Sequence, residues 1–315
     1  FLKNETDSLD ADLVIIDEAS MMDIRLFRSL LAAIDRGTRL ILVGDVDQLP
    51  AVGPGNVLSD IINSGEFEVV RLEKIYRQGG KSQIIYNAHR IRDGIYPSIK
   101  NSDYNDFYFI EKNDPQEVVE SIIGLITKRI PSSFNYRPAE DIQVIVPTNR
   151  GLVGVNNLNT RIQESLNKTG IYFSRGATQF RLNDKVIQLK NNYEKEVFNG
   201  DIGFVRSIDF EMKEILVNYE GRVVAYDFFD TDQLGLSYAI SIHKSQGSEF
   251  KCVIIPILTS HFMLLQRNLL YTAITRAKEV AILIGSKKAI GIAVNRNNVE
   301  NRFTGLKNMI LEHCS

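Results

Sequence analysis

The stretch LVIIDEAS at residues 13–20 decides the fold of this chain, because an apolar and largely β-branched run ends there in two adjacent carboxylates. Such a run is typical of a buried strand in a parallel sheet. Ligands of open α/β sheets lie at the carboxyl ends of the strands, so Asp17 and Glu18 would stand where a ligand binds. The first carboxylate suits a Mg²⁺ ion that carries nucleotide phosphates, and the second can deprotonate an attacking water. A buried strand that runs into a solvated acidic turn would give the same pattern.

The pattern returns further along the chain, where the apolar run RLILV at 39–43 leads into GDVDQLP at 44–50. Residues 24–34, between the two runs, carry apolar side chains at helical spacing. We therefore predict a β-α-β unit with parallel strands. Gln48 would then lie beside the two acids, where an uncharged amide can contact both a γ-phosphate and a water. A turn amide that bonds to its own backbone is the alternative interpretation of Gln48.

Five ordered motifs extend this interpretation along the chain: DEAS at 17–20, GDVDQLPAVGPGN at 44–56, LEKIYRQ at 72–78, SIHKSQGSEF at 241–250 and NLLYTAITRAK at 268–278. Together they resemble motifs II to VI of superfamily 1 helicases. The segments QLPAVGPG and HKSQGSE, together with PTNRG at 147–151, are similar to the RecD/TraA branch of that superfamily. This branch includes RecD-like helicases and the exodeoxyribonuclease V alpha subunit. The resemblance runs from about residue 11 to about residue 286.

The resemblance implies an α/β protein with two RecA-like motor domains, which are parallel sheets of the P-loop NTPase type. Residues 1–70 would be the C-terminal part of the first, truncated motor domain. Residues 71–172 and 236–315 would form the second motor domain. Short strand patterns over 173–235 would form an SH3-like β-barrel inserted in it.

The same resemblance implies an ATP-dependent DNA helicase or translocase that moves 5′→3′ on single-stranded DNA. Its work would lie in DNA recombination or repair. A cytoplasmic location is expected because Cys252 and Cys314 form no metal or disulfide pattern, which fits a reducing compartment. Its partners would be ATP, single-stranded DNA, duplex junctions and a nuclease/helicase complex, with no membrane involved. The cofactors implied are ATP and Mg²⁺.

Nucleotide hydrolysis depends on positioning and on neutralising phosphate charge. By resemblance, Asp17 would hold Mg²⁺, Glu18 would be the base for the attacking water and Gln48 would sense the γ-phosphate. Arg77 and Arg276 would reach the γ-phosphate from the second motor domain, because the planar guanidinium binds phosphate oxygens bidentately. For either arginine alone, a surface salt bridge would be the simpler explanation.

Further residues match positions that contact nucleotide or DNA in this superfamily. Glu249 would contact the nucleotide sugar, although an exposed loop acid is the alternative, and Gly247 would allow close backbone approach. For His243 a purely structural role is the alternative, and strand termination with helix capping is the alternative at 148–150. The expected DNA-binding residues are Thr148, Asn149, Arg150, Ser241 and His243.

One expected motif is missing from the sequence. The P-loop string GxxxxGK[ST], which cradles phosphates, does not occur, and GPGN at 53–56 lacks the lysine. The chain also starts with Phe1 rather than Met. We therefore expect the C-terminal part of a longer helicase, and we expect this part alone to be inactive. The alternatives are a helicase of other polarity or RNA preference, and a non-catalytic nucleic-acid-binding or assembly subunit with degenerate motor domains.

The amino-acid composition says less about the class of protein than the motifs do. The 315 residues are 44% hydrophobic and 24% charged, with a net charge of −2, so a nucleic-acid site would have to be a local groove. The two cysteines form no disulfide or metal pattern, and no apolar run reaches the ~18 residues of a membrane span. Three local expectations complete the interpretation: a strand over 69–72, a loop over 95–116, and Lys185 on a solvated or DNA-facing side of the barrel.

Overall fold

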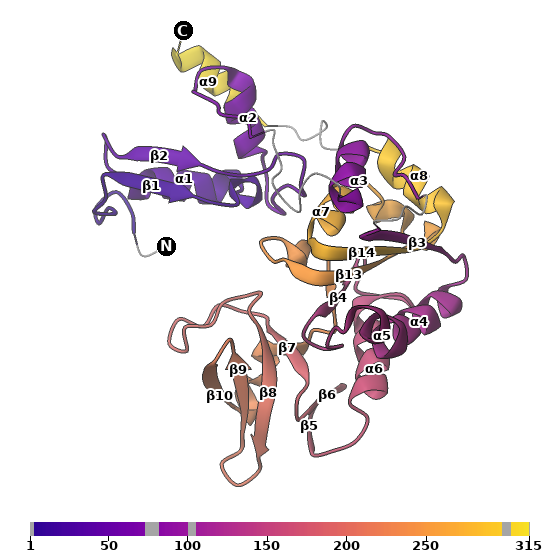
Figure 1. The fold of residues 1–315 in the computed structure, drawn as a ribbon. Coiled ribbons are helices and arrows are strands. Elements are labelled where there is room, and N and C mark those ends of the chain that lie inside the picture. The colour runs from indigo at the N-terminus through magenta and orange to yellow at the C-terminus, as the bar shows by residue number, and fades with distance from the viewer. Residues whose placement is uncertain (1–2, 73–81, 100–104, 298–303, 315) are drawn as a thin grey trace.

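The computed structural model describes residues 3–72, 82–99, 105–297 and 304–314. Arg77, and with it the LEKIYRQ motif beyond Leu72, lies outside these residues. The described elements form a small parallel unit, a five-stranded parallel sheet with helices on both faces, and an antiparallel barrel (Figure 1). No helix among the described residues is long and apolar enough to cross a membrane.

The first unit contains the predicted β-α-β crossover. Strands β1 (Leu13–Ile16) and β2 (Arg39–Leu42) pair in parallel. Helix α1 (Ile24–Ala33) connects them and begins where the Asp23 carboxylate accepts a backbone N–H, which satisfies one free donor of the first turn. Helix α2 (Val57–Ser64) follows and packs with α1 in a shared apolar cluster.

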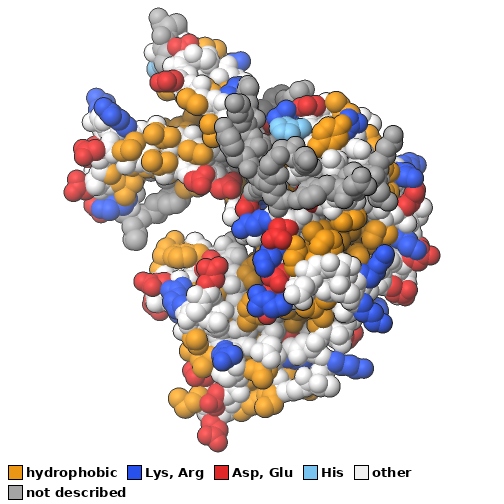
Figure 2. Space-filling view, viewed as in Figure 1, with side chains coloured by type: hydrophobic (Ala, Val, Ile, Leu, Met, Phe, Trp, Pro, Cys, Tyr) orange, Lys and Arg blue, Asp and Glu red, His pale blue; other side chains and the backbone are white. Residues whose placement is uncertain are grey.

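The strand β1 is less buried than its sequence predicts. Leu13, Ile15 and Ile41 remain 45%, 58% and 47% exposed, and Figure 2 shows hydrophobic side chains gathered over this sheet. Among the described residues, only the opposite face of the sheet is covered by a packed cluster that includes Ile16, Leu40 and Leu42. The expectation of a strand buried on both faces was therefore wrong for this structure.

The second unit is a parallel sheet in the order β12-β4-β13-β14-β3. Apolar side chains of the central strand β13 alternate between two clusters, so both faces of the sheet are buried. Helices α3, α7 and α8 pack on one face, and α4, α5 and α6 on the other (Figure 1). The strands are β3 (Phe107–Glu111), β4 (Ile142–Val146), β12 (Ala239–Ser241), β13 (Phe250–Ile257) and β14 (Ala277–Gly285). The helices are α3 (Gln83–Arg92), α4 (Pro115–Gly124), α5 (Ile130–Phe134), α6 (Val155–Leu166), α7 (Arg267–Thr275) and α8 (Lys287–Asn295), with a π-helical turn at Leu125–Arg129 between α4 and α5.

Two local expectations are corrected here. The segment 95–116 contains strand β3, which pairs with β14, so it is not simply a loop. Its run of aromatic and apolar residues occupies the edge of the sheet, and polar neighbours on either side hid that pattern. Residues 69–72 form no strand in the structure.

A small antiparallel barrel is inserted between α6 and β12. Its main sheet has the order β10-β9-β8-β7-β11, and β5 pairs with β6 beside it. Val217 and Tyr226 are buried in its core. The strands are β5 (Tyr172–Arg175), β6 (Thr178–Arg181), β7 (Lys185–Gln188), β8 (Ile202–Asp209), β9 (Glu214–Tyr219), β10 (Arg222–Asp227) and β11 (Leu234–Leu236).

The last helix, α9 (Leu306–Cys314), departs from the predicted organisation. We expected residues 236–315 to belong to the second motor domain, yet α9 packs beside α2 of the first unit (Figure 1). The hydroxyl of Thr304 donates to Asp60 at 2.7 Å, and Leu306 joins the apolar cluster of the first unit. A short amphipathic helix carries no local signal that identifies its packing partner.

Lys185 is also not where the sequence placed it. Its side chain is 2% exposed, at the junction of the barrel with the second sheet. Its ammonium lies 3.4 Å from the Ile142 carbonyl oxygen and 5.7 Å from the centre of the Phe250 ring. Burial lowers the pKa of Lys185 from 10.5 to about 8, so the charged form is disfavoured in the folded state. The side chain cannot reach DNA from this position.

Replacing Lys185 with Met is expected to stabilise the fold. The unfolded chain binds more protons than the folded one between pH 8 and 10.5, so wild-type stability rises with pH across that window. Lys185→Met should raise the free energy of unfolding at pH 7 by about 1–3 kcal/mol and remove that rise. Denaturant unfolding at pH 7 and at pH 10 checks both effects. Lys190→Met, at an exposed ion pair with Asp232, is the matched control and should change little.

Candidate active site

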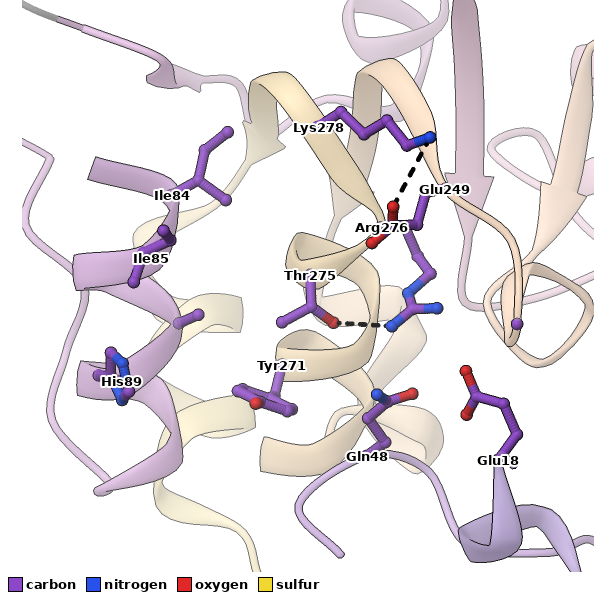
Figure 3. Close-up of a pocket in the computed structure, with 12 residues that line it drawn as sticks. Glu18, Gln48, Ile84, Ile85, His89, Glu249, Tyr271, Thr275, Arg276 and Lys278 are labelled. Atoms are coloured by element: carbon purple, nitrogen blue, oxygen red, sulfur yellow. Dashed lines mark hydrogen bonds and ion pairs between the residues drawn. The ribbon is translucent and has the colours of Figure 1, made fainter. Parts of the chain in front are cut away.

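A cavity of about 550 Å³ lies between the first unit and the second. Figure 3 shows Glu18 and Gln48 of the first unit facing Arg276 of the second across this space. One wall is charged or polar, and the other is the apolar side of α3. The lining residues are Glu18, Gln48, Ile84, Ile85, Ala88, His89, Gly247, Glu249, Tyr271, Thr275, Arg276 and Lys278.

Both acids of the DEAS motif follow β1 directly. Glu18 has a φ of 52°, an uncommon left-handed conformation for this residue type, and its backbone N–H donates to Asp17 Oδ1 at 2.8 Å. This turn directs Glu18 into the cavity, whereas Asp17 is exposed and outside the lining. No cluster of three or more potential metal ligands occurs in the described part of the chain. A single carboxylate still fits Mg²⁺, because that ion commonly binds one or two carboxylates together with substrate phosphates and waters.

Gln48 is almost fully buried, with 9% of its surface exposed. Its Nε2 donates to Asp45 Oδ2 at 3.3 Å, which fixes which end of the amide faces the acid. Its Oε1 is buried and has no hydrogen-bond partner among the described residues. A buried acceptor without a partner costs about 1–3 kcal/mol, so this oxygen is suited to receive a hydrogen bond from a ligand or a water in the cavity.

Arg276 directly follows the last residue of α7 and is 5% exposed. Three neutral oxygens orient its guanidinium: Nε donates to the Thr272 carbonyl, Nη1 to the Ser248 carbonyl and Nη2 to Thr275 Oγ1, each at 3.3 Å. The charge is thus held at the edge of the cavity by two oxygens of α7 and one of the segment before β13. A planar, permanently charged fork in this position suits an anionic phosphate.

Glu249 and Lys278 form an ion pair at 3.7 Å beside Arg276 (Figure 3). Gly247 lines the same cavity with a φ of 73°, a conformation that glycine adopts at little cost. The structure therefore gathers Glu18, Gln48, Gly247, Glu249 and Arg276 in one place. Sequence reasoning did not select the α3 wall, His89, Tyr271 or Lys278, although Tyr271 and Lys278 lie within the NLLYTAITRAK motif.

The residues expected to bind DNA lie at the carboxyl ends of the strands of the second sheet, away from the cavity. Ser241 ends β12 and pairs in register with Val146, the last residue of β4, and 148–150 follows directly. Glu249 and Arg276, by contrast, precede β13 and β14. The cavity and the residues expected to bind DNA thus occupy opposite ends of the parallel strands.

The contacts of these residues fit DNA binding and fit a purely structural role equally well. Thr148 and Arg150 line a cavity of about 380 Å³ that also includes His261 and Met263. The Thr148 hydroxyl accepts the Arg150 N–H at 3.3 Å, as a turn-closing residue would. His243 is exposed, yet the surrounding protein lowers the pKa of its imidazole, which favours the neutral ring.

Comparisons with known proteins agree with the fold. Residues 2–111 match the model of an AAA domain, 158–219 that of the SH3 domain of ATP-dependent RecD-like DNA helicases, and 236–284 that of the UvrD-like helicase C-terminal domain. A crystal structure of Pif1 helicase from Bacteroides in complex with ADP-AlF3 and ssDNA has a similar fold. The TM-score is 0.52 at 21% identity, over 87% of this chain and 70% of that one. By its fold and by these domain matches the chain is similar to part of a helicase motor.

Sequence relatives narrow this class. The chain is 34% identical over 315 residues to the ATP-dependent RecD2 DNA helicase of Deinococcus radiodurans, covering 99% of this chain and 42% of the relative. It is 28% identical over 329 residues to the RecBCD enzyme subunit RecD of Mycobacterium tuberculosis, covering 98% of this chain and 55% of that one. The chain is thus similar to RecD-type helicases of superfamily 1 over nearly its whole length. It spans about half the length, or less, of these relatives.

Proposed function

We propose that the protein is an ATP-dependent DNA helicase or translocase that acts on single-stranded DNA. The observation that carries this proposal is the cavity between the two units, where Glu18 and Gln48 face Arg276 (Figure 3). These residues come from distant parts of the chain and supply a base, an amide acceptor and a cation. That combination suits hydrolysis of a nucleoside triphosphate, in which positioning and charge neutralisation dominate.

Each side chain has a defined role in the proposed reaction. Glu18 accepts a proton from the attacking water, and the free Oε1 of Gln48 holds that water by accepting its other hydrogen. Arg276 stabilises the charge of the γ-phosphate in the transition state, and Arg77 would do the same from outside the described residues. Glu249 contacts the nucleotide sugar, and Gly247 allows the backbone to approach the nucleotide closely. Asp17 would hold Mg²⁺, which neutralises phosphate charge when bound.

Hydrolysis would be coupled to movement because the cavity has walls from two units. Loss of the γ-phosphate removes the anion that Arg276 of the second unit would contact across the cavity from Glu18 and Gln48, so the two units can separate and close again. Single-stranded DNA would run along the edge formed by Ser241, His243 and residues 148–150. The Pif1 structure of similar fold is described as bound to ssDNA, which supports a DNA strand as the partner.

The finer parts of the proposal rest on family resemblance. We infer 5′→3′ movement, a cytoplasmic location and a role in DNA recombination or repair. Six of the curated relatives are named as RecD subunits of the RecBCD enzyme, so a nuclease/helicase complex is the proposed assembly.

Unwinding of tailed duplexes by the full-length protein tests this function. We expect ATP-dependent unwinding of a duplex with a 5′ single-stranded tail and little unwinding of one with a 3′ tail. The 315-residue chain alone should hydrolyse ATP negligibly, because no phosphate-cradling P-loop string is present. Unwinding only from a 3′ tail would reverse the inferred polarity, and unwinding without ATP would exclude the proposed role of the cavity.

The missing P-loop string favours a second candidate, a nucleic-acid-binding or assembly subunit with degenerate motor domains. The same experiment separates the two. A non-catalytic subunit would bind single-stranded DNA with no ATP turnover in the full-length protein. DNA-stimulated turnover would reject it.

A further inference from the structure

The backbone next to Gln48 is held by the second unit. The Leu49 N–H donates to Thr272 Oγ1 at 2.8 Å, and the Leu49 carbonyl accepts from Gln246 Nε2 at 2.7 Å. Leu49 and Thr272 are both buried, so the bond between them is shielded from water, and the bond from Gln246 is partly buried. Both polar groups of one residue in the first unit are therefore bound by side chains of the second. We call these two bonds the Leu49 clamp.

A second contact fixes the side chain of Gln48. The Tyr271 hydroxyl donates to Asp45 Oδ2 at 2.9 Å, and the same oxygen accepts Gln48 Nε2 at 3.3 Å. Burial and the Asp45 carboxylate raise the pKa of Tyr271, so its hydroxyl stays a donor at neutral pH. Because Asp45 holds the NH₂ end of the amide, the carbonyl oxygen of Gln48 is left facing away from the acid, without a partner among the described residues.

The Tyr271 contact and the Thr272 bond of the Leu49 clamp come from one helix, whereas Gln246 lies in the turn after β12. Tyr271 and Thr272 are consecutive residues of α7, and Arg276 follows one turn after Thr272. The Thr272 carbonyl accepts Arg276 Nε while its hydroxyl accepts the Leu49 N–H. Gln48 and Arg276 therefore take their positions from the same rigid element, although they belong to different units.

We propose that Tyr271 and Thr272 are positioning residues that orient Gln48 toward the attacking water only when the two units are docked. This inference rests on the proposed ATP hydrolysis at the cavity. It assigns to α7 a task besides carrying Arg276, since the helix also sets the direction of the amide in the opposite unit. When the units part, Asp45 loses the Tyr271 hydroxyl and Leu49 loses its clamp, so the bond from Gln48 Nε2 to Asp45 is left as the one contact among the described residues that orients the amide.

Kinetics of the full-length protein with saturating single-stranded DNA test this inference. Tyr271→Phe keeps the ring and removes the hydroxyl, and Thr272→Val keeps the shape and removes the acceptor. Each should lower kcat for ATP about 10-fold or more while KM changes less than about twofold. Tyr271→Phe combined with Gln48→Ala should be no slower than Gln48→Ala alone, because the tyrosine acts through the amide.

Tyr136→Phe is the matched control, since its hydroxyl donates to Glu279 at 2.5 Å and Tyr136 does not line the cavity. It should leave kcat unchanged. If the losses in kcat caused by Tyr271→Phe and by Gln48→Ala multiply in the double variant, the inference is contradicted. A raised KM at constant kcat would also contradict it and would make Tyr271 a nucleotide-binding residue.

Hydrogen exchange separates failure of this inference from failure of the proposed function, because it needs no turnover. Thr272→Val should speed exchange of the Leu49 amide, whereas Tyr136→Phe should not. Unchanged exchange in Thr272→Val would show that the clamp does not form in solution. If wild type lacks DNA-stimulated hydrolysis but the amide is protected, the proposed function fails while the clamp stands as a contact between the units.

Discussion

Arg276→Ala in the full-length protein is expected to reduce DNA-stimulated ATP turnover by about 10³-fold or more, the effect of removing an arginine finger. The guanidinium is buried at the edge of the cavity and aimed by three oxygens of its own unit, so few other groups could replace its charge. Binding of ADP should change much less, because ADP lacks the γ-phosphate. Steady-state hydrolysis and titration with a fluorescent ADP analogue measure the two effects.

Two further variants test whether the loss of turnover depends on the guanidinium at position 276. Arg276→Lys should restore little of the ATP turnover, since a point charge cannot reproduce the planar guanidinium. Arg222→Ala, at an exposed ion pair with Glu196 on the barrel, should retain wild-type turnover. Full activity of Arg276→Ala would reduce the arginine to a structural residue and remove the link between the two units that the proposed function requires. Arg77→Ala is expected to behave as Arg276→Ala does.

Local periodicity accounts for the parts of the fold that the sequence predicted well. The β-α-β crossover of the first unit and strand β4 follow from apolar runs with clear ends. Those ends also placed Glu18 and Gln48 at the carboxyl edge of one sheet, and the structure brings both to the cavity. Strand β3 was missed because its apolar run is short and has polar flanks, so its partner β14 rather than its own pattern defines it.

Features that depend on long-range packing were not predictable. Lys185 occupies a strand position whose polar residue type indicates solvent, yet the second sheet covers it. The contact of Tyr271 with Asp45 joins residues 226 positions apart, and nothing local to either residue indicates the other. The same is true of Thr272 and Leu49. A motif identifies the chemistry of a side chain, whereas the partners that orient it come from the tertiary fold.

Glu18→Gln in the full-length protein should lower turnover by about 10²–10⁴-fold and leave ATP affinity nearly unchanged. The amide keeps the shape of the side chain and its place in the cavity, but it cannot take a proton from water. The left-handed backbone at Glu18 belongs to the turn after β1, and Gln can occupy it as Glu does. ATP binding measured in the absence of turnover, together with steady-state hydrolysis, distinguishes the base from a binding group.

Asp17→Asn and Glu196→Gln provide the comparison. Asp17 would hold Mg²⁺, so its variant should require more Mg²⁺ for half-maximal turnover, an effect that Glu18→Gln should not share. Glu196→Gln, on the exposed side of the barrel, should match wild type. A parallel loss of ATP affinity and turnover in Glu18→Gln would assign Glu18 to nucleotide binding instead. Retention of both would mean that another group takes the proton, and the turn after β1 would then serve only to place Asp17.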